Sequence, residues 1–338
     1  MNQKINWGIL STGHIAQLFA QAVLESKTGI LGAVASRSLS QAEAFARRYK
    51  IPMAYGNYEK LLLDPFVDAV YIGTPHSLHA EWALKAARAG KAVLCEKPLT
   101  LHYPAARRMV QTAQNHGVFL MEGFMYRCHP QTAKLVDLIQ KKAVGQVKLI
   151  QASFCFERPV DLKGRLFNRA LGGGAIWDVG CYPVSMARLL AGAALGKPFA
   201  EPLEVKGTGI VGAQSRVDEF ALANLKFPGG ILAELSCANR VQRPVGVWVY
   251  GTKGWIHASS PWHADRFSAD GAKILMRRAG SKKTRELRIR SRESLYALEV
   301  DAVGKALRRG WKESPAMSWA DSLGNAKVLD AWMRAVGL

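Results

Sequence analysis

A short turn near the N-terminus has the residue types that bind the phosphates of a dinucleotide. After a strand-like run from Ile5 to Leu10, the sequence reads Ser11-Thr12-Gly13-His14-Ile15-Ala16. This fits the G-x-G-x-x-G/A fingerprint with serine at the first glycine position, and Gly13 lets the backbone approach a pyrophosphate. The N–H groups at the helix start then face the phosphates. We predict dinucleotide contacts from Ser11, Thr12, Gly13, His14 and Ile15, the alternative being an ordinary strand-to-helix turn.

The end of the next strand bears on which dinucleotide is bound. NAD sites usually carry an acidic residue about 20 positions further on, where it holds the ribose 2′-hydroxyl. Here the strand ends Ala35-Ser36-Arg37-Ser38, without an acid. Arginine and hydroxyl groups bind a 2′-phosphate, which a carboxylate would repel. We therefore prefer NADP(H) over NAD(H), with Ser36, Arg37 and Ser38 as contacts; otherwise Arg37 stacks on the adenine or points to solvent.

Four further segments with polar side chains fall at strand ends, where open α/β sheets bind ligands. They are Gly73–His79, Cys95–Pro98, Met121–Arg127 and the glycine-rich Gly172–Tyr182. His76 and His79 have helical spacing, but no third metal ligand is evident, so we predict no metal site. With Thr74 they are expected beside the nicotinamide ribose. Asp178 and Tyr182 are four residues apart and would share one face of a helix.

The elements that position these segments alternate in the first part of the chain. Short apolar strands are predicted at 5–10, 31–36, 68–73, 91–95 and 118–121, and helices at 14–27, 41–49, 78–89 and 105–116. Gly90 and Gly117 stand where helices would end. Strands that are apolar throughout, alternating with helices, indicate a parallel sheet covered on both faces. We predict a doubly wound Rossmann domain over residues 1–125.

The pattern changes after about residue 145. Strands are predicted at 147–156, 205–212, 220–227, 230–238, 245–250, 255–258, 273–276 and 286–290, joined by tight turns such as Pro228-Gly-Gly. Between them only 178–190 has a helical pattern, and a last helix is expected at about 319–336. The fold class is therefore α/β plus α+β. Residues 126–338 form a substrate-binding and oligomerisation domain on a large, mostly antiparallel open sheet, with the last helix a candidate to contact the first domain.

Composition excludes several classes of protein. The chain has 338 residues, 49% of them hydrophobic, which is enough to form a core and excludes general disorder. No apolar run approaches the roughly 18–20 residues of a membrane span. Met1-Asn2-Gln3-Lys4 leads directly into a strand without an apolar signal region, so we expect a cytoplasmic protein. The five cysteines, Cys95, Cys128, Cys155, Cys181 and Cys237, are far apart and are expected to be buried thiols.

The chain is basic, with a formal net charge of +20. Many of these charges lie between Lys273 and Arg292, where Arg285-Glu-Leu-Arg-Ile-Arg alternates polar and apolar residues as a half-exposed strand does. Basic clusters bind nucleic acids in some proteins. We favour a solvated basic face and predict no nucleic-acid partner, with attraction of acidic ligands as a weaker alternative.

Together these motifs resemble the Gfo/Idh/MocA oxidoreductases, over essentially the whole chain. The resemblance rests on Glu96-Lys97-Pro98 in a strand-end loop and on Asp178-x-Gly-x-Tyr182 after a glycine triplet. Many family members have histidine where this chain has Tyr182. Tyrosine there is typical of the branch that contains dimeric dihydrodiol dehydrogenase and NADP-dependent D-xylose 1-dehydrogenase.

The resemblance implies roles for individual residues. Lys97 and Tyr182 correspond to the proposed catalytic pair of that branch, and a neighbouring ammonium favours the phenolate needed to take a hydroxyl proton. Asp178 is expected to orient Lys97 or a sugar hydroxyl. Other site candidates have two interpretations each. Glu96 and Arg127 fix the nicotinamide amide or the substrate, and Glu122 contacts substrate or pairs with Arg127. Trp177 covers the nicotinamide or a sugar face. Arg169, which follows Asn168, reaches substrate or lies on a surface loop.

The predicted function is an NADP(H)-dependent dehydrogenase or reductase acting on a carbinol carbon of a sugar, polyhydroxy or dihydrodiol substrate. Two alternatives are a cofactor-recycling glycoside hydrolase of the same fold and a non-catalytic dinucleotide-binding sensor. The resemblance implies a homodimer or homotetramer through the C-terminal sheet, with a small carbohydrate-like molecule as the other partner.

Overall fold

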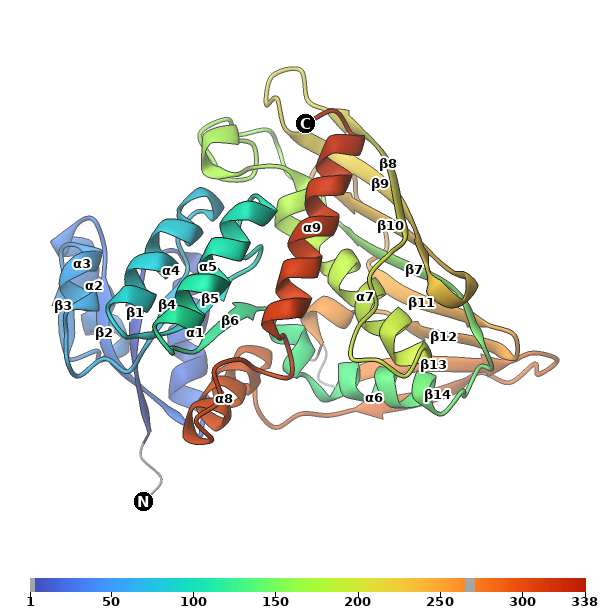
Figure 1. Ribbon diagram of the computed structural model, residues 1–338, viewed down its shortest axis with the longest axis horizontal. Coiled ribbons are helices and arrows are strands. Elements are labelled where there is room, and N and C mark those ends of the chain that lie inside the picture. The colour runs from blue at the N-terminus through green and yellow to red at the C-terminus, as the bar shows by residue number, and fades with distance from the viewer. Residues whose placement is uncertain (1–3, 265–270) are drawn as a thin grey trace. The chain divides into compact units, whose positions relative to one another are not determined.

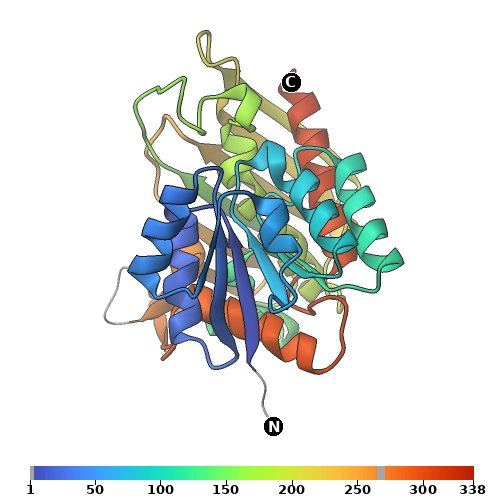
Figure 2. The same ribbon diagram turned by 90° about the vertical axis from the view of Figure 1, so that its left-hand side faces the viewer.

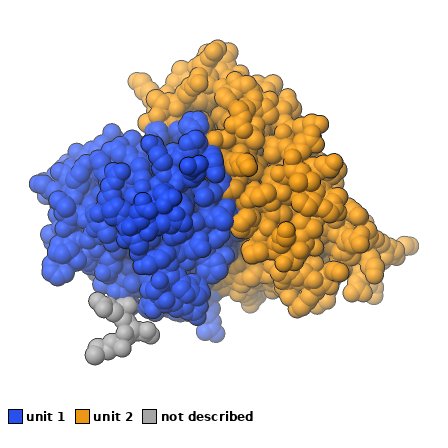
Figure 3. Space-filling view, in the orientation of Figure 1, with its two compact units in different colours: residues 1–128, 292–323 blue, residues 129–291, 324–338 orange. Residues whose placement is uncertain are grey.

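The computed structural model describes residues 4–264 and 271–338. Most of the segment 1–4, which the sequence analysis took as leading directly into the first strand, lies outside the described residues. The chain divides into two compact units, which Figure 3 colours separately. Unit 1 comprises residues 1–128 and 292–323, and unit 2 comprises residues 129–291 and 324–338.

Unit 1 contains a six-stranded parallel sheet, in the order β3-β2-β1-β4-β5-β6. Its strands are β1 (Ile5–Leu10), β2 (Gly29–Ala35), β3 (Met53–Tyr55), β4 (Ala69–Ile72), β5 (Ala92–Glu96) and β6 (Leu120–Gly123). The central strands are buried along almost their whole length, which explains why their sequences are apolar throughout. The predicted Rossmann sheet is confirmed, with β3 added at one edge.

Helices lie on both faces of this sheet, as Figure 2 shows. They are α1 (His14–Glu25), α2 (Leu39–Tyr49), α3 (Tyr58–Leu62), α4 (His79–Arg88), α5 (Tyr103–Asn115) and α8 (Leu295–Arg308). Gly90 and Gly117 follow α4 and α5 with φ of +74° and +60°, the left-handed conformation that glycine adopts at low cost. α8 comes from the far end of the sequence and packs against α1.

Unit 2 contains an eight-stranded sheet in the order β14-β13-β12-β11-β7-β10-β9-β8 (Figure 1). Its strands are β7 (Val147–Cys155), β8 (Glu204–Val211), β9 (Asp218–Phe227), β10 (Ile231–Ala238), β11 (Gly246–Gly251), β12 (Gly254–Ala258), β13 (Ala272–Arg278) and β14 (Arg285–Ile289). Among the described strand pairs of this sheet, only β7–β10 is parallel, which confirms that the sheet is mostly antiparallel.

Helices cover one face of this second sheet. α6 (Pro130–Gln140) and α7 (Cys181–Ala194) pack against it, and the five residues Ile176–Gly180 form a π-helical turn that leads into α7. The predicted helix 178–190 therefore begins earlier and ends later. The last helix, α9 (Trp319–Ala335), is anchored to this unit where the Trp332 indole N–H donates to the Leu222 carbonyl at 3.0 Å.

Several expectations about single residues and patches are confirmed. Four of the cysteines are buried and Cys128 is half-buried, and none of the five, all among the described residues, forms a disulfide. The basic run at 277–286 is exposed across the turn between β13 and β14. Within the described ranges, no helix has both the length and the apolar character to cross a membrane.

Candidate active site

The turn between β1 and α1 in unit 1 is shaped for a phosphate group. Ser11, at the first glycine position of the fingerprint, has φ of +119°, and its Oγ accepts the N–H of Gly13 at 3.1 Å. No described side chain caps α1, whose N-cap is Gly13. A Cβ built on Gly13 would have only the Ser11 Oγ within 4 Å among described atoms, at 3.4 Å. The fold itself therefore does not require glycine there, and the open N–H groups fit a dinucleotide pyrophosphate.

The end of β2 presents the residues predicted to choose between dinucleotides. Ser36 is buried, Arg37 is exposed and Ser38 caps α2 by accepting the N–H of Gln41 at 3.5 Å. The guanidinium of Arg37 is thus accessible to a ligand, whereas the Ser38 hydroxyl already has a structural role. This arrangement fits an adenosine ribose with or without a 2′-phosphate.

The predicted ribose contacts lie at the end of β4. His79 is fully buried, and its Nδ1 and Nε2 lie 2.9 Å from the Pro98 carbonyl oxygen and 3.0 Å from the Thr74 carbonyl oxygen. His79 therefore ties the β4 loop to the loop that holds Lys97. His76 packs edge-on against His79, with ring centroids 5.6 Å apart. Among the described residues no group of three His, Cys, Asp or Glu has an arrangement that holds a metal ion.

Lys97 follows β5 directly, and its neighbours are fixed by hydrogen bonds from other strands. Glu96 is buried, and its Oε1 accepts the Tyr71 hydroxyl from β4 at 2.6 Å. Glu122, at the end of β6, accepts the N–H of Leu99 at 2.8 Å. Lys97 itself is half-buried. The Glu96–Leu99 segment is thereby held from both neighbouring strands, which fixes the backbone that carries the Lys97 ammonium.

Arg127 is engaged within unit 1. Its side chain is 4% exposed, it forms an ion pair with Asp321, and its Nε donates to the Ala316 carbonyl at 3.0 Å. Both partners lie in the segment 292–323, so Arg127 fastens that segment to the end of the sheet. The predicted contact of Arg127 with nicotinamide or substrate remains a prediction.

Unit 2 carries the second group of predicted site residues around the start of α7. The Asp178 carboxylate lies 2.7 Å from the Arg165 guanidinium, and Asp178 is 5% exposed whereas Arg165 is 54% exposed. The Tyr182 ring packs edge-on against Phe154 and tilted against Trp262, with centroids 5.2 and 5.6 Å apart. These contacts fix the direction of the Tyr182 ring and place a cation beside Asp178.

The remaining candidates lie in the same segment of unit 2. Trp177 is buried in the π-helical turn. Asn168 caps the short helix Arg169–Leu171 by accepting the N–H of Ala170 at 3.0 Å, and Arg169 is exposed. Arg169 therefore remains accessible, as a substrate contact requires.

Comparisons with known proteins agree with this geometry. The family model described as "Oxidoreductase family, NAD-binding Rossmann fold" matches residues 5–124, and the model described as "GFO/IDH/MocA C-terminal domain" matches residues 132–257. The chain belongs to the Gfo/Idh/MocA oxidoreductase family. It is similar to trans-1,2-dihydrobenzene-1,2-diol dehydrogenases, with 34% identity to that of Xenopus laevis over 98% of both chains, and 32% to that of Mus musculus over 99% and 97%.

Solved structures of this oxidoreductase family have the same architecture. A 3-ketoreductase from Actinomadura kijaniata, in complex with NADP and TDP-benzene, matches with a TM-score of 0.87 and 27% identity over 99% of this chain and 98% of that one. An aldose–aldose oxidoreductase from Caulobacter crescentus, complexed with glycerol, matches with a TM-score of 0.87 and 26% identity over 98% and 97%.

Sequence reasoning missed three residues that organise the site of this Gfo/Idh/MocA protein. Tyr71 binds Glu96, Arg165 binds Asp178, and Asp218 accepts the N–H of Ile176 at 2.6 Å. Tyr71 was assigned only to an apolar strand. Arg165 carried a weak signal, since it is a basic residue in the loop before the glycine triplet. Asp218 lies 42 positions from Ile176, and no sequence signal links the two residues.

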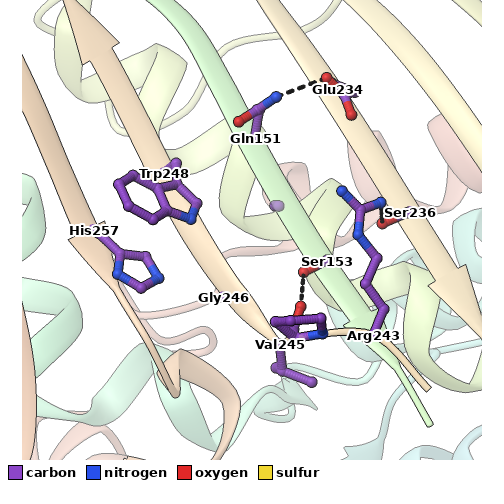
Figure 4. Close-up of a pocket in the computed structure, with 11 residues that line it drawn as sticks. Gln151, Ser153, Glu234, Ser236, Arg243, Val245, Gly246, Trp248 and His257 are labelled. Carbon is purple, nitrogen blue, oxygen red and sulfur yellow. Dashed lines mark hydrogen bonds between the residues drawn. The ribbon is translucent and has the colours of Figure 1, made fainter.

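A separate pocket lies on the sheet face of unit 2 that α6 and α7 leave open (Figure 4). Its polar floor includes a Gln151–Glu234 hydrogen bond of 2.8 Å, and the Arg243 guanidinium donates to the Ser236 hydroxyl at 2.8 Å. Trp248 and His257 stack beside them with ring centroids 3.9 Å apart. None of these residues belongs to the predicted catalytic set.

Proposed function

We propose that this protein is an NADP(H)-dependent oxidoreductase that interconverts a carbinol and a carbonyl in a sugar, polyhydroxy or dihydrodiol substrate. The observation that carries the proposal is that dihydrodiol dehydrogenases match this chain through both units, over 98% of both chains. The similar 3-ketoreductase was solved with NADP, and also as variants with a lysine or a tyrosine replaced, the two residue types that we propose as the catalytic pair here.

The chain's own residues account for binding of the dinucleotide. The Gly13 turn and the uncapped start of α1 would receive the pyrophosphate, and Arg37 with Ser36 would receive the adenosine ribose. When bound, the nicotinamide supplies or accepts the hydride. We assign NADP(H) rather than NAD(H) because the end of β2 offers a guanidinium and hydroxyls but no carboxylate.

Tyr182 is the proposed proton donor and acceptor. During reduction the phenol gives its proton to the oxygen of the carbonyl, and during oxidation the phenolate takes the proton of the hydroxyl. Its ring is held by Phe154 and Trp262, so that the hydroxyl is presented in one direction. Lys97 is the proposed second member of the catalytic pair, because an ammonium stabilises a phenolate and an oxygen that develops charge.

Asp178 and Arg165 supply polar contacts for the substrate. The Asp178 carboxylate can accept hydrogen bonds from the hydroxyl groups of a polyol while it pairs with Arg165. Arg165 and Arg169 are exposed and bring positive charge to the same loop. These side chains suit a substrate rich in hydroxyl groups.

The test is to mix the purified protein with NADP⁺ and a panel of aldoses, polyols and trans-dihydrodiols, and to follow the absorbance of reduced cofactor. Reduction with at least one member of the panel is expected. Equilibrium binding of NADP⁺ is measured in parallel. Bound NADP⁺ with no reduction by any substrate, and no oxidation of NADPH with the corresponding carbonyl compounds, would contradict the proposal.

We also propose that the protein forms a homo-oligomer through the open sheet face of unit 2. That face exposes large apolar side chains on neighbouring strands, with Leu222 36%, Leu232 51% and Ile210 64% exposed. Apolar side chains that lie together on a sheet face favour association with another surface.

A further inference from the structure

Asp218 is a fully buried carboxylate at the first residue of β9 that the proposed reaction does not use. Its Oδ2 accepts the backbone N–H of Ile176 at 2.6 Å. Its Oδ1 has no hydrogen-bond partner among the described residues. The carboxylate therefore points at the first turn of the helical segment that carries Asp178 and Tyr182.

The last glycine of the triplet before this helix lies against the same carboxylate. Gly174 has φ of +122°, and a Cβ built on it would lie 2.3 Å from the Asp218 Oδ1 atom. A Cβ on Gly173 would lie 2.8 Å from the Leu166 carbonyl oxygen. Any side chain at Gly174 would thus displace Asp218, so the last glycine of the triplet is explained by a residue 44 positions further along the chain.

The helix needs an acceptor at this end. The first N–H groups of a helix have no partner within it, and here the N-terminal turn is a π-helix, a less stable form frequent at functional sites. Ala175, the N-cap residue of the turn, has no side chain that could accept these N–H groups. The turn is closed by the Asp178 N–H, which donates to the Gly174 carbonyl at 3.1 Å, and by Asp218.

We propose that Asp218 is a positioning residue, which holds the turn from Gly174 to Asp178 and thereby the direction in which Asp178 and Tyr182 face the substrate. This role rests on the proposed function. Loss of the carboxylate frees the Ile176 N–H and lets the π-helical turn relax. Asp178 lies within that turn, and Tyr182 lies one helical turn beyond it. A misplacement of the reacting groups by about 1 Å costs on the order of a hundredfold in rate.

The burial of this carboxylate also affects its ionisation. Burial raises the pKa of Asp218 to about 7, while the N–H groups of Ile176 and Ala175 act in the opposite direction. Burial, with a contribution from Asp218, raises the pKa of the Cys237 thiol on β10 well above the usual range. Since a buried carboxylate without a countercharge destabilises a fold, a stability role alone does not account for it.

The test compares two substitutions of Asp218 with a control. Asp218→Asn keeps the shape and one acceptor oxygen, whereas Asp218→Ala removes the acceptor. Ser294→Ala is the control, because Ser294 caps α8 in unit 1 by accepting the N–H of Ala297 and lies outside the proposed site. Steady-state kinetics and hydrogen exchange of the amides between residues 172 and 182 are measured for each.

Asp218→Ala is expected to lower kcat by about tenfold to a hundredfold, with the KM for NADP⁺ within about twofold of wild type. Exchange should quicken at residues 172–182 in particular, and Asp218→Asn should recover most of both properties. Ser294→Ala should leave kcat and this exchange unchanged. If Asp218→Ala does not fold, Asp218→Leu, which fills the site without an acceptor for the Ile176 N–H, takes its place in the same measurements and is expected to behave alike.

Three results would overturn the proposal. They are a kcat of Asp218→Ala within twofold of wild type, an equal loss in Asp218→Asn and Asp218→Ala, or faster exchange spread evenly over unit 2. If the wild-type protein reduces no cofactor at all, the proposed function fails. The exchange measurement then still decides whether Asp218 holds the turn.

Discussion

At the scale of single residues, the proposed chemistry depends on one phenol whose ring is held by two aromatic side chains. Tyr182 is 4% exposed and lies between Phe154 and Trp262. Tyr182→Phe keeps these ring contacts and removes only the group that transfers the proton. We expect kcat to fall by about 10²–10⁴ while the Kd for NADP⁺ is unchanged, as measured by steady-state kinetics and cofactor titration. Tyr49→Phe, at a buried tyrosine of α2 in unit 1, is the matched control and should keep full activity.

Arg37 tests the choice of cofactor. Arg37→Asp places a carboxylate where the ribose of an NAD site usually finds one, and where a 2′-phosphate would be repelled. The loss of one arginine–phosphate contact is worth about 1–3 kcal/mol, so the Kd for NADP⁺ should rise by about tenfold to a hundredfold. The Kd for NAD⁺ should change little. Arg47→Asp, on the exposed side of α2, makes the same charge change and should leave both dissociation constants unchanged. If Arg37→Asp weakens the binding of NADP⁺ and NAD⁺ equally, the 2′-phosphate contact is refuted.

Glu299 on α8 is another buried carboxyl group, and its effect on stability depends on pH. Neither carboxyl oxygen has a hydrogen-bond partner among the described residues. Burial, and then the nearby Glu96 carboxylate, raises the pKa of Glu299 well above its usual range. Because the folded pKa exceeds the unfolded one, the stability that Glu299 contributes is complete at acidic pH and is lost as the pH rises toward the folded pKa.

Glu299→Met, which keeps the volume and the helix propensity, should therefore raise the free energy of unfolding by about 1–3 kcal/mol at pH 8. The gain should shrink toward pH 5, because less of the stability that the raised pKa of Glu299 removes from the wild type is lost there. Urea unfolding at both pH values measures it. A gain of the same size at the two pH values, or a loss at pH 8, would show that Glu299 does not behave as a buried neutral acid.

At the scale of elements, α8 and the α1–β2 turn of unit 1 are joined by one carboxylate. Asp301 is 3% exposed, and its Oδ1 accepts the N–H groups of Lys27 and Thr28 at 3.0 Å and the Thr28 hydroxyl at 2.8 Å. Asp301→Ala leaves these donors without their acceptor and should lower the free energy of unfolding by about 2–4 kcal/mol in urea. Asp301→Asn retains an acceptor and should lose less than half of that; a loss below 1 kcal/mol in Asp301→Ala would mean that α8 is held by apolar contacts alone.

The same elements show what local sequence patterns reveal. Alternating apolar strands and amphipathic helices predicted the order of nearly every strand, because hydrophobic period follows burial directly. β3 and α3 were missed because they have only three and five residues, which is too short to show a hydrophobic period. α6 and α8 were missed although each is long enough to be read: Leu135, Leu138 and Ile139 on α6 have helical spacing, and Ser294 precedes α8 as a cap.

The predicted site was limited in a different way. Strand-end positions are local, so the loops that contain Gly13, Lys97 and Asp178 were found from their motifs. The partners that fix them come from distant segments, as Asp218 does for Ile176 and Asp321 does for Arg127. Such pairs obey no sequence spacing. Only the folded chain brings them together. It also shows that Gly174 of the glycine triplet leaves room for the Asp218 carboxylate.

At the scale of the whole molecule, the open face of the unit 2 sheet predicts association. Leu232 on β10 lies opposite Lys226 on β9, in a row that continues through Leu149 on β7 to Tyr250 on β11 and Trp255 on β12. Stable dimers bury about 800 Å² on each partner, which a sheet of eight strands can supply. A second copy of the same face would cover these side chains, since symmetric interfaces use one surface twice.

Leu232→Glu tests this by placing a charge from each copy in the proposed interface. The side chain is already half exposed, so unfolding should be little affected, whereas light scattering during size exclusion should show a shift from oligomer to monomer at micromolar concentration. Phe66→Glu, at a 78% exposed residue of unit 1, is the control and should leave the mass unchanged. If wild type is monomeric, or if Leu232→Glu keeps the wild-type mass, another surface or none joins the copies. Because all the proposed catalytic residues of unit 2 lie in the segment from Gly172 through α7, whose helix packs on the covered face of the sheet, the monomeric variant should keep its kcat.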